Sequence, residues 1–281
     1  MPLIRSLLLV GVLLAGLSLA MPAEANPLPR HQPVPGGVAV IGLGDTDFGQ
    51  GDLVRFNDRP VMVREVNGEW TAVIGIPLDA TPGEQRAEIR HRDGGRQPLA
   101  FEIRDKQYEE SRLTVEREMV HPSEEALRRI GRETRQIRSA LQTWSDAPQA
   151  WNLAFPYPVE GRRTSPFGLR RYFNDEARRP HSGLDIAASV GTPIVAPGPG
   201  RVVETGDFYF NGKSVFIDHG QGLVTMYCHM DSIEVSVGDR VDTGTPLGTV
   251  GATGRVTGPH LHWSVSLNGT MVDPDLFLAN P

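Results

Sequence analysis

Short apolar runs separated by turn residues dominate this 281-residue chain, and they constrain its fold more than any other feature. In the N-terminal part, each run alternates apolar and polar residues, and glycine, proline, asparagine or aspartate stands between successive runs. The candidate strands are residues 53–56, 61–66, 70–74, 86–91 and 99–103. Several short strands with turn signals at this spacing predict a small β-sandwich over residues 34–105.

The segment from residue 106 to residue 150 has a different pattern. Ser123 precedes Glu124 and Glu125, an arrangement typical of a helix start, with a capping hydroxyl and acidic residues in the first turn. Apolar side chains then recur at helical spacing at Leu127, Ile130, Ile137 and Leu141. We therefore predict one amphipathic linker helix over about residues 123–143. The mixed charges of its other face favour contact with solvent over contact with a membrane surface.

Residues 151–281 return to short apolar runs with glycine or proline between them. The candidate strands are residues 193–196, 201–204, 214–218, 223–228 and 260–266. This pattern predicts a compact, mostly antiparallel β domain. The whole chain is therefore expected to be mainly β, with an N-terminal β-sandwich, a linker α-helix and a C-terminal antiparallel β-sheet domain.

The first 25 residues have the composition of a signal peptide. Arg5 precedes an apolar run over residues 7–20, and Ala23-Glu24-Ala25 offers small residues for cleavage. The run is shorter than the roughly 20 residues that a membrane helix needs. We expect a periplasmic or secreted protein that has no membrane contact once the signal is removed; an uncleaved anchor is the alternative. The net charge of −6 argues against a nucleic-acid partner.

Five of the eight histidines lie in the last 101 residues, at positions 181, 219, 229, 260 and 262. His260 and His262 share one face of a predicted strand, about 7 Å apart. His181 and Asp185 are four residues apart, and a curved loop that enters a strand can bring both to one ion. Two imidazoles and a carboxylate suit catalytic zinc, which keeps one position open. His219, at a strand–turn boundary, is expected to be structural.

The chain has a single cysteine, Cys228, so no internal disulfide can form. It lies next to His229, which raises the idea of a cysteine nucleophile. However, residues 227–230 are expected to form a strand, in which adjacent side chains point to opposite faces. We therefore interpret Cys228 as a small buried apolar residue.

The C-terminal motifs resemble the lysostaphin/LytM-type zinc metalloendopeptidases, which hydrolyse peptidoglycan. The matching segments are TSPFG at 164–168, HSGLDIA at 181–187, GTPIVAP at 191–197, YCHM at 227–230, and GATG at 251–254 through GPHLHW at 258–263. The resemblance covers about residues 160–278. The earlier segment IPLDA at 76–80 resembles the β-sandwich domain often found N-terminal to such peptidases.

This resemblance implies a zinc-dependent endopeptidase that hydrolyses peptide cross-links of bacterial peptidoglycan with metal-activated water and a histidine general base. It makes His181, Asp185 and His262 the zinc ligands. It makes His229 and His260 the catalytic pair. The implied partners are peptidoglycan stem peptides and cross-bridges, and a protein inhibitor or adaptor is a further candidate.

Three residues are candidates for substrate binding. Tyr227 lies two residues before His229 and is expected to share its strand face. Arg170 and Arg171 belong to a run of arginines before His181 that could attract the carboxylates of a stem peptide. A solubilising loop is the alternative interpretation of these arginines.

Other functions are also open at this point. The chain could be a catalytically silent peptidoglycan-binding or amidase-activator module. Two histidines and a carboxylate also describe non-haem iron oxygenases. A likeness to biotinyl carrier domains around residues 237–248 lacks the required lysine. The sequence leaves open whether a D-Ala–diaminopimelate bond or a glycine bridge is cut, and whose wall is attacked.

Overall fold

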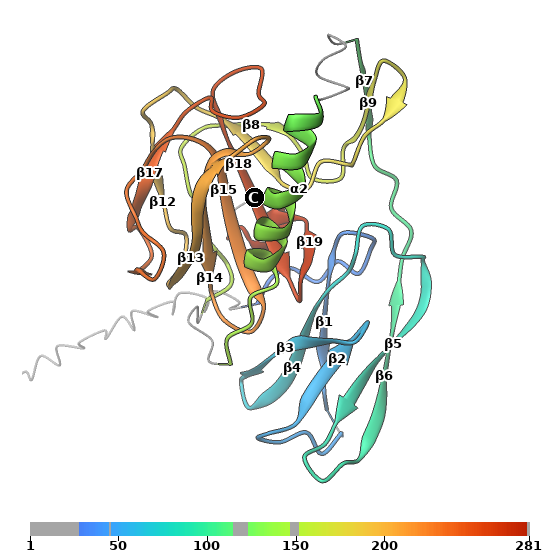
Figure 1. Cartoon of the computed structure of the whole chain (residues 1–281). Helices are drawn as coiled ribbons and strands as arrows, with labels where there is room; N and C mark the ends of the chain where they lie inside the picture. The colour runs from blue at the N-terminus through green and yellow to red at the C-terminus, as the bar shows by residue number, and fades with distance from the viewer. Residues whose placement is uncertain (1–27, 45, 115–122, 147–151, 280–281) are drawn as a thin grey trace, which may run out of the picture.

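The computed structural model describes residues 28–44, 46–114, 123–146 and 152–279, and it is mainly β, as predicted (Figure 1). The expected signal peptide over residues 1–25 lies outside the described residues. Within the described part, no helix is long and apolar enough to cross a membrane. The division of the chain at residues 34–105, 106–150 and 151–281 remains a prediction.

Six strands form the N-terminal unit: β1 (Val38–Gly42), β2 (Leu53–Phe56), β3 (Arg59–Val66), β4 (Glu69–Gly75), β5 (Gly83–Arg90) and β6 (Arg96–Ile103). They pair antiparallel in the order β1-β4-β3-β2-β5-β6, and the sheet curls around one core to which every strand contributes. Asn57 and Asp58, then Asn67 and Gly68, have positive φ angles, as two-residue hairpin turns require. The turn residues seen in the sequence therefore join β2 to β3 and β3 to β4.

The predicted linker helix is confirmed as α2 (Glu124–Leu141). The Ser123 hydroxyl accepts a hydrogen bond from the amide of Ala126 at 3.2 Å, which caps the first turn. The C-terminal part of the apolar stripe, including Ala140, packs against buried residues of the large C-terminal sheet. Leu127, at the other end of the stripe, is 54% exposed.

Within residues 152–279, the C-terminal unit has twelve strands and a short 3-10 helix, η1 (Pro274–Phe277). The strands are β8 (Arg162–Ser165), β9 (Arg170–Phe173), β10 (Glu176–Ala177), β11 (Leu184–Ala187), β12 (Pro193–Val195), β13 (Gly200–Phe208), β14 (Gly212–Asp218), β15 (Leu223–Ile233), β16 (Arg240–Val241), β17 (Pro246–Val250), β18 (His260–Leu267) and β19 (Thr270–Val272). The main path of the large sheet is β16-β13-β14-β15-β18-β11-β8.

The two faces of β18 have different surroundings. Leu261, Trp263 and Val265 alternate along the strand and enter the main core of the C-terminal unit. The intervening side chains face the other side, where the Ser266 hydroxyl donates a hydrogen bond to the carbonyl of Leu141 at the end of α2. Since His260 and His262 share the face of Ser266, they lie on the same face of the sheet as α2. Figure 1 shows α2 lying across this sheet.

A short strand, β7 (Glu110–Leu113), lies in the linker and pairs parallel with β9. It extends the β9–β10 hairpin into a three-stranded sheet, and β7 and β9 run side by side in Figure 1. The sequence did not predict this strand because a strand held by backbone pairing alone needs no alternation of apolar residues. The linker is therefore part of the C-terminal unit's structure.

The N-terminal unit packs against the C-terminal sheet. Val38, Met62 and Val73 are fully buried in the core of the C-terminal unit. The Asn268 side chain accepts from the amide of Gly75 at 2.6 Å and donates to its carbonyl at 3.1 Å. Asn268 directly follows β18, whereas His260 begins that strand. The N-terminal unit is therefore docked at the end of β18 opposite to the histidines.

Candidate metal centre

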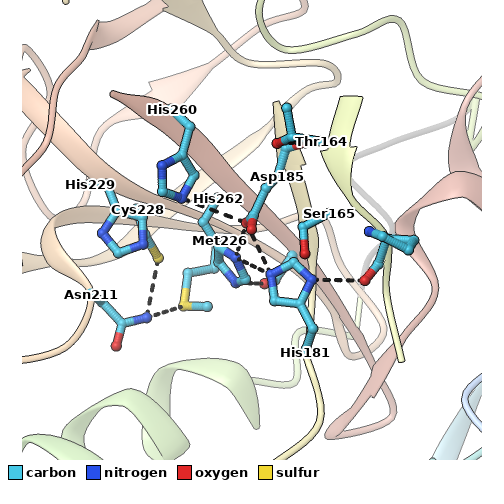
Figure 2. Close-up of polar contacts among 12 residues, drawn as sticks. Thr164, Ser165, His181, Asp185, Asn211, Met226, Cys228, His229, His260 and His262 are labelled. Atoms are coloured by element: carbon cyan, nitrogen blue, oxygen red, sulfur yellow. Dashed lines mark hydrogen bonds and ion pairs between the residues drawn. The ribbon is translucent and has the colours of Figure 1, made fainter. Parts of the chain in front are cut away.

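Three polar side chains converge where β11 and β18 run side by side. Asp185 on β11 is the register partner of His262 on β18, and His181 lies in the turn before β11. Asp185 Oδ1 is 2.9 Å from His181 Nε2 and 2.8 Å from His262 Nδ1, and the two nitrogens are 3.0 Å apart (Figure 2). In the described ranges, these three residues form a buried group that could hold a metal ion.

Backbone contacts set the orientation of His181. Its Nδ1 is 2.8 Å from the carbonyl of Pro166. A carbonyl can only accept, so Nδ1 carries the proton. In the neutral imidazole the lone pair is therefore on Nε2, the nitrogen that faces Asp185. On His262 the opposite nitrogen is anchored: Nε2 is 2.9 Å from the Ser264 hydroxyl, which leaves Nδ1 facing the same point.

Asp185 is held in its charged form. Burial alone would raise the pKa of this carboxyl, but hydrogen bonds with His181 and His262 outweigh that effect and hold the pKa well below its ordinary value. The second carboxylate oxygen, Oδ2, is 3.4 Å from a guanidinium nitrogen of Arg171. Each oxygen of the carboxylate therefore has a partner.

The donor set fits a divalent cation. His181 Nε2, His262 Nδ1 and Asp185 Oδ1 meet at 2.8–3.0 Å, and a cation placed among them would be bound by two imidazole nitrogens and a carboxylate oxygen. Burial favours the neutral imidazole of His262 and contributes to its lowered pKa. Two histidines and one carboxylate are a ligand set of catalytic zinc, with a fourth position open.

Two further histidines face this cluster. His229 Nδ1 is 2.9 Å from the carbonyl of Thr253, and His260 Nδ1 is 2.9 Å from the carbonyl of Gly258. Both Nδ1 atoms therefore donate, which leaves each Nε2 available. The two rings have centroids 4.8 Å apart, and His260 Nε2 lies 3.7 Å from Asp185 Oδ1 (Figure 2). Burial, with the nearby His262, lowers the pKa of His229 to about 3, so its imidazole is neutral at neutral pH.

A bulge in β15 aims His229 at the cluster. Val215 pairs with Tyr227 and Lys213 with Met230, so β15 has one more residue than β14 over this interval. His229 has a φ of +65°, a left-handed conformation that is uncommon for a residue other than glycine. Such strain at a polar site supports a functional role for its side chain.

The bulge also corrects the expectation for Tyr227. Strand alternation predicts that Tyr227 and His229 share one face, but the extra residue breaks the alternation between them. Tyr227 is fully buried in the core, and its hydroxyl lies 2.9 Å from the hydroxyl of Thr225. Burial raises its pKa. Tyr227 therefore has no surface to offer to a substrate.

The remaining predicted residues lie as follows. Arg171 contacts Asp185 and the Ser165 hydroxyl, so it faces the candidate metal ligands. Arg170 is half exposed and lies 4.0 Å from Glu110 of β7.

Cys228 is fully buried in the cluster that packs against α2, where desolvation raises the pKa of its thiol to about 11. His219 is buried between the carbonyl of Pro199 and the Thr225 hydroxyl, in keeping with a structural role.

Sequence reasoning missed the residues that orient the histidines. Ser264 lies two residues after His262, so the two-residue period of a strand could have indicated it. Pro166, Thr253 and Gly258 act through backbone carbonyls, for which residue type gives no signal. Arg171 was identified, but its contact with Asp185 depends on the path of the β9–β10 hairpin.

Comparison with known proteins identifies families that this chain resembles in both its N-terminal and its C-terminal part. The profile of Peptidase family M23 matches residues 179–274, and that of the Peptidase family M23 N-terminal domain matches residues 31–106. A crystal structure from Pseudomonas aeruginosa, described as an M23 peptidase, is 42% identical in sequence with a TM-score of 0.75. That match covers 89% of this chain and 96% of the other.

Two curated relatives carry names that state an activity. The peptidoglycan DD-endopeptidase ShyC of Vibrio cholerae is 42% identical over 119 residues, which are 42% of this chain and 28% of that protein. The DD-carboxypeptidase/endopeptidase Mpg of Neisseria meningitidis is 40% identical over 116 residues, which are 41% of this chain and 27% of that protein. The matched segments thus span less than a third of these relatives.

Proposed function

Because this chain belongs to peptidase family M23, we propose that it is a zinc-dependent endopeptidase that hydrolyses DD-peptide bonds in the cross-links of bacterial peptidoglycan. The observation that carries the proposal is the convergence of His181 Nε2, Asp185 Oδ1 and His262 Nδ1 within 3.0 Å of one another. The names of the curated relatives support the substrate. The protein would act where this polymer lies, in the periplasm or outside the cell.

In this proposal, His181, Asp185 and His262 hold the zinc. A zinc ion at such a site polarises a carbonyl and lowers the pKa of water towards neutrality. The protein's own contribution begins with orientation, since the Pro166 carbonyl and the Ser264 hydroxyl fix which nitrogen of each imidazole faces the ion.

His229 and His260 complete the reaction. The neutral His229 accepts a proton from water on Nε2, because its Nδ1 is committed to the carbonyl of Thr253. As the peptide bond breaks, the proton held by His229 passes to the leaving amine nitrogen. His260, also anchored through Nδ1, presents Nε2 from the adjacent position, and when this nitrogen carries a proton it donates a hydrogen bond to the peptide oxygen on which negative charge develops. Neither imidazole needs to turn during the reaction, since each is held by a backbone carbonyl.

The charges beside the cluster support a substrate that carries an extra carboxylate. Arg171 and Arg178 are cross-strand neighbours, with the Arg178 amide donating to the Arg171 carbonyl at 2.8 Å. Partial desolvation and the positive charges of Arg178 and Arg171 lower the pKa of Arg255. The Arg171 guanidinium reaches Asp185, and the Arg178 guanidinium lies 2.7 Å from Glu176, so positive charge stands beside the cluster. A D-Ala–diaminopimelate cross-link carries a carboxylate that this positive charge would attract, whereas a glycine bridge carries none.

Digestion of defined peptidoglycan fragments tests the proposal. The zinc-loaded protein is incubated with a D-Ala–diaminopimelate cross-linked dimer and, separately, with a pentaglycine-bridged peptide, and products are identified by mass spectrometry. We expect cleavage of the DD bond in the first substrate. Cleavage of the glycine bridge alone would refute the assignment of substrate, and an intact dimer under zinc-loaded conditions would refute the activity.

Two variants separate chemistry from metal binding. His229→Ala should keep zinc and lose turnover, since His229 is outside the three-residue group. His262→Ala should lose zinc and turnover together. If the wild-type protein held zinc and bound peptidoglycan without cutting it, the alternative of a silent binding or amidase-activating module would be favoured.

A further inference from the structure

The side chain of Tyr108 lies where the N-terminal unit, the linker and the C-terminal unit meet. Its hydroxyl donates a hydrogen bond of 2.6 Å to the carbonyl of Pro35, in the N-terminal part. Lys106 Nζ lies 4.7 Å from the centre of its ring. Burial raises the pKa of the phenol, so the hydroxyl stays protonated and remains a donor. Tyr108 is thus fixed at its outer end by the N-terminal unit.

The other side of the Tyr108 ring lies against the turn at residues 166–169. A methyl group at Gly168 would lie 2.1 Å from ring carbons of Tyr108, so the ring rests directly on the Gly168 backbone. The ring also packs edge-on against Phe167, with centroids 6.3 Å apart. Gly36 leaves room for both aromatic rings, since a methyl group there would lie 2.5 Å from Phe167. The Tyr108 ring is therefore packed closely against Gly168 and Phe167.

This turn holds His181 at three points. The Pro166 carbonyl accepts from His181 Nδ1 at 2.8 Å. The Gly168 amide donates to the His181 carbonyl at 2.8 Å, and the His181 amide donates to the Leu169 carbonyl at 2.9 Å. Any shift of the turn must therefore move the ring or the backbone of His181.

We propose that Tyr108 is a positioning residue for the metal centre, which keeps the turn at residues 166–169 in the place where it orients His181. The inference rests on the proposed zinc site. Tyr108 is not one of the three candidate ligands, and in this proposal it acts through the turn. The linker extends the same contact, because the Arg170 amide directly after the turn donates to the carbonyl of Glu109, the residue before β7, at 2.9 Å, and β7 then pairs with β9. The docked N-terminal unit and linker thus support the wall of the site.

Zinc affinity measured by competition with a chromogenic chelator tests this inference on the full chain. Tyr108→Ala removes the ring from Gly168 and should weaken zinc binding by about tenfold, the lower end of the effect of changing groups that orient metal ligands. Tyr108→Phe keeps the ring on the turn and should restore nearly all of the affinity. If Tyr108→Ala does not fold, Tyr108→Leu replaces it, because leucine fills space but cannot lie flat on the Gly168 backbone.

Tyr157→Ala is the matched control, since Tyr157 is a partly buried tyrosine that packs against the C-terminal core. It should lower the melting temperature and leave zinc affinity unchanged. Equal zinc affinity in wild type and Tyr108→Ala would overturn the positioning role of Tyr108 but not the proposed zinc site. The same conclusion would follow if Tyr157→Ala weakened zinc binding as much as Tyr108→Ala does. A wild-type protein that binds no zinc would overturn the proposed function and this inference with it.

Discussion

Ser264→Ala is expected to weaken zinc binding without unfolding the protein. The Ser264 hydroxyl lies 2.9 Å from His262 Nε2, and it is the group that fixes Nδ1 towards the ion. Ser264 is fully buried, and the His262 side chain is only 12% exposed, so water cannot readily replace the lost partner. An unpaired buried donor costs about 1–3 kcal/mol.

That cost sets the size of the expected effect. A change of 1.4 kcal/mol corresponds to about a factor of ten in a binding constant. The Kd for zinc should therefore rise by about 10- to 100-fold, in line with the loss of other groups that orient metal-bound histidines. Chelator competition measures this Kd, and the fold is checked by circular dichroism.

Ser266→Ala is the control, because it makes the same substitution two residues further along the same face of β18. The Ser266 hydroxyl is fully buried and donates to the Leu141 carbonyl at 3.0 Å. Its loss should lower the free energy of unfolding by about 1 kcal/mol and leave the Kd for zinc unchanged. Unchanged zinc affinity in Ser264→Ala, or equal weakening in both variants, would refute the reasoning.

Three further predictions concern charge and burial. Burial lowers the pKa of His219 to about 4, so the folded state takes up its proton less readily than the unfolded state, whose pKa is near 6.5. The free energy of unfolding should therefore fall by about 3 kcal/mol as the pH drops from 6.5 to 4, and His219→Gln should flatten that part of the profile; a parallel profile would contradict the assignment. Cys228, with its pKa raised to about 11, should resist a thiol reagent at pH 8 until the protein unfolds, and rapid labelling of the native protein would contradict its burial. Arg171→Gln should raise the KM for the cross-linked dimer without weakening zinc binding, because it removes a positive charge that lies 3.4 Å from a carboxylate oxygen of Asp185; weaker zinc binding with an unchanged KM would contradict the substrate-attracting role.

Most strands and the helix could be predicted from the sequence because their signals are local. The alternation and turn residues around Asn57 and Asn67 are sufficient to locate β2, β3 and β4. Ser123 and the two acidic residues after it mark the start of α2. The strand β7 could not be predicted, since its residues gain their structure from backbone pairing with β9, which is distant in the sequence.

The site was predictable to the extent that it follows strand periodicity. His260 and His262 share a face of β18, and the structure brings them together with His181 and Asp185. Tyr227 was misplaced because one extra residue in β15 reverses the alternation before His229. Tyr108 gave no signal because its contact is with the backbone of Gly168. Bulges and backbone contacts depend on tertiary packing, so the types of the neighbouring residues in the sequence do not indicate where they form.

The zinc K-edge X-ray absorption spectrum of the loaded protein tests the metal centre most directly. The account predicts one zinc per chain, surrounded by nitrogen and oxygen with the multiple scattering of two imidazoles, and loss of this signal in His262→Ala. A sulfur shell at about 2.3 Å, which would place the ion on Cys228, or a spectrum unaltered by His262→Ala, would contradict it.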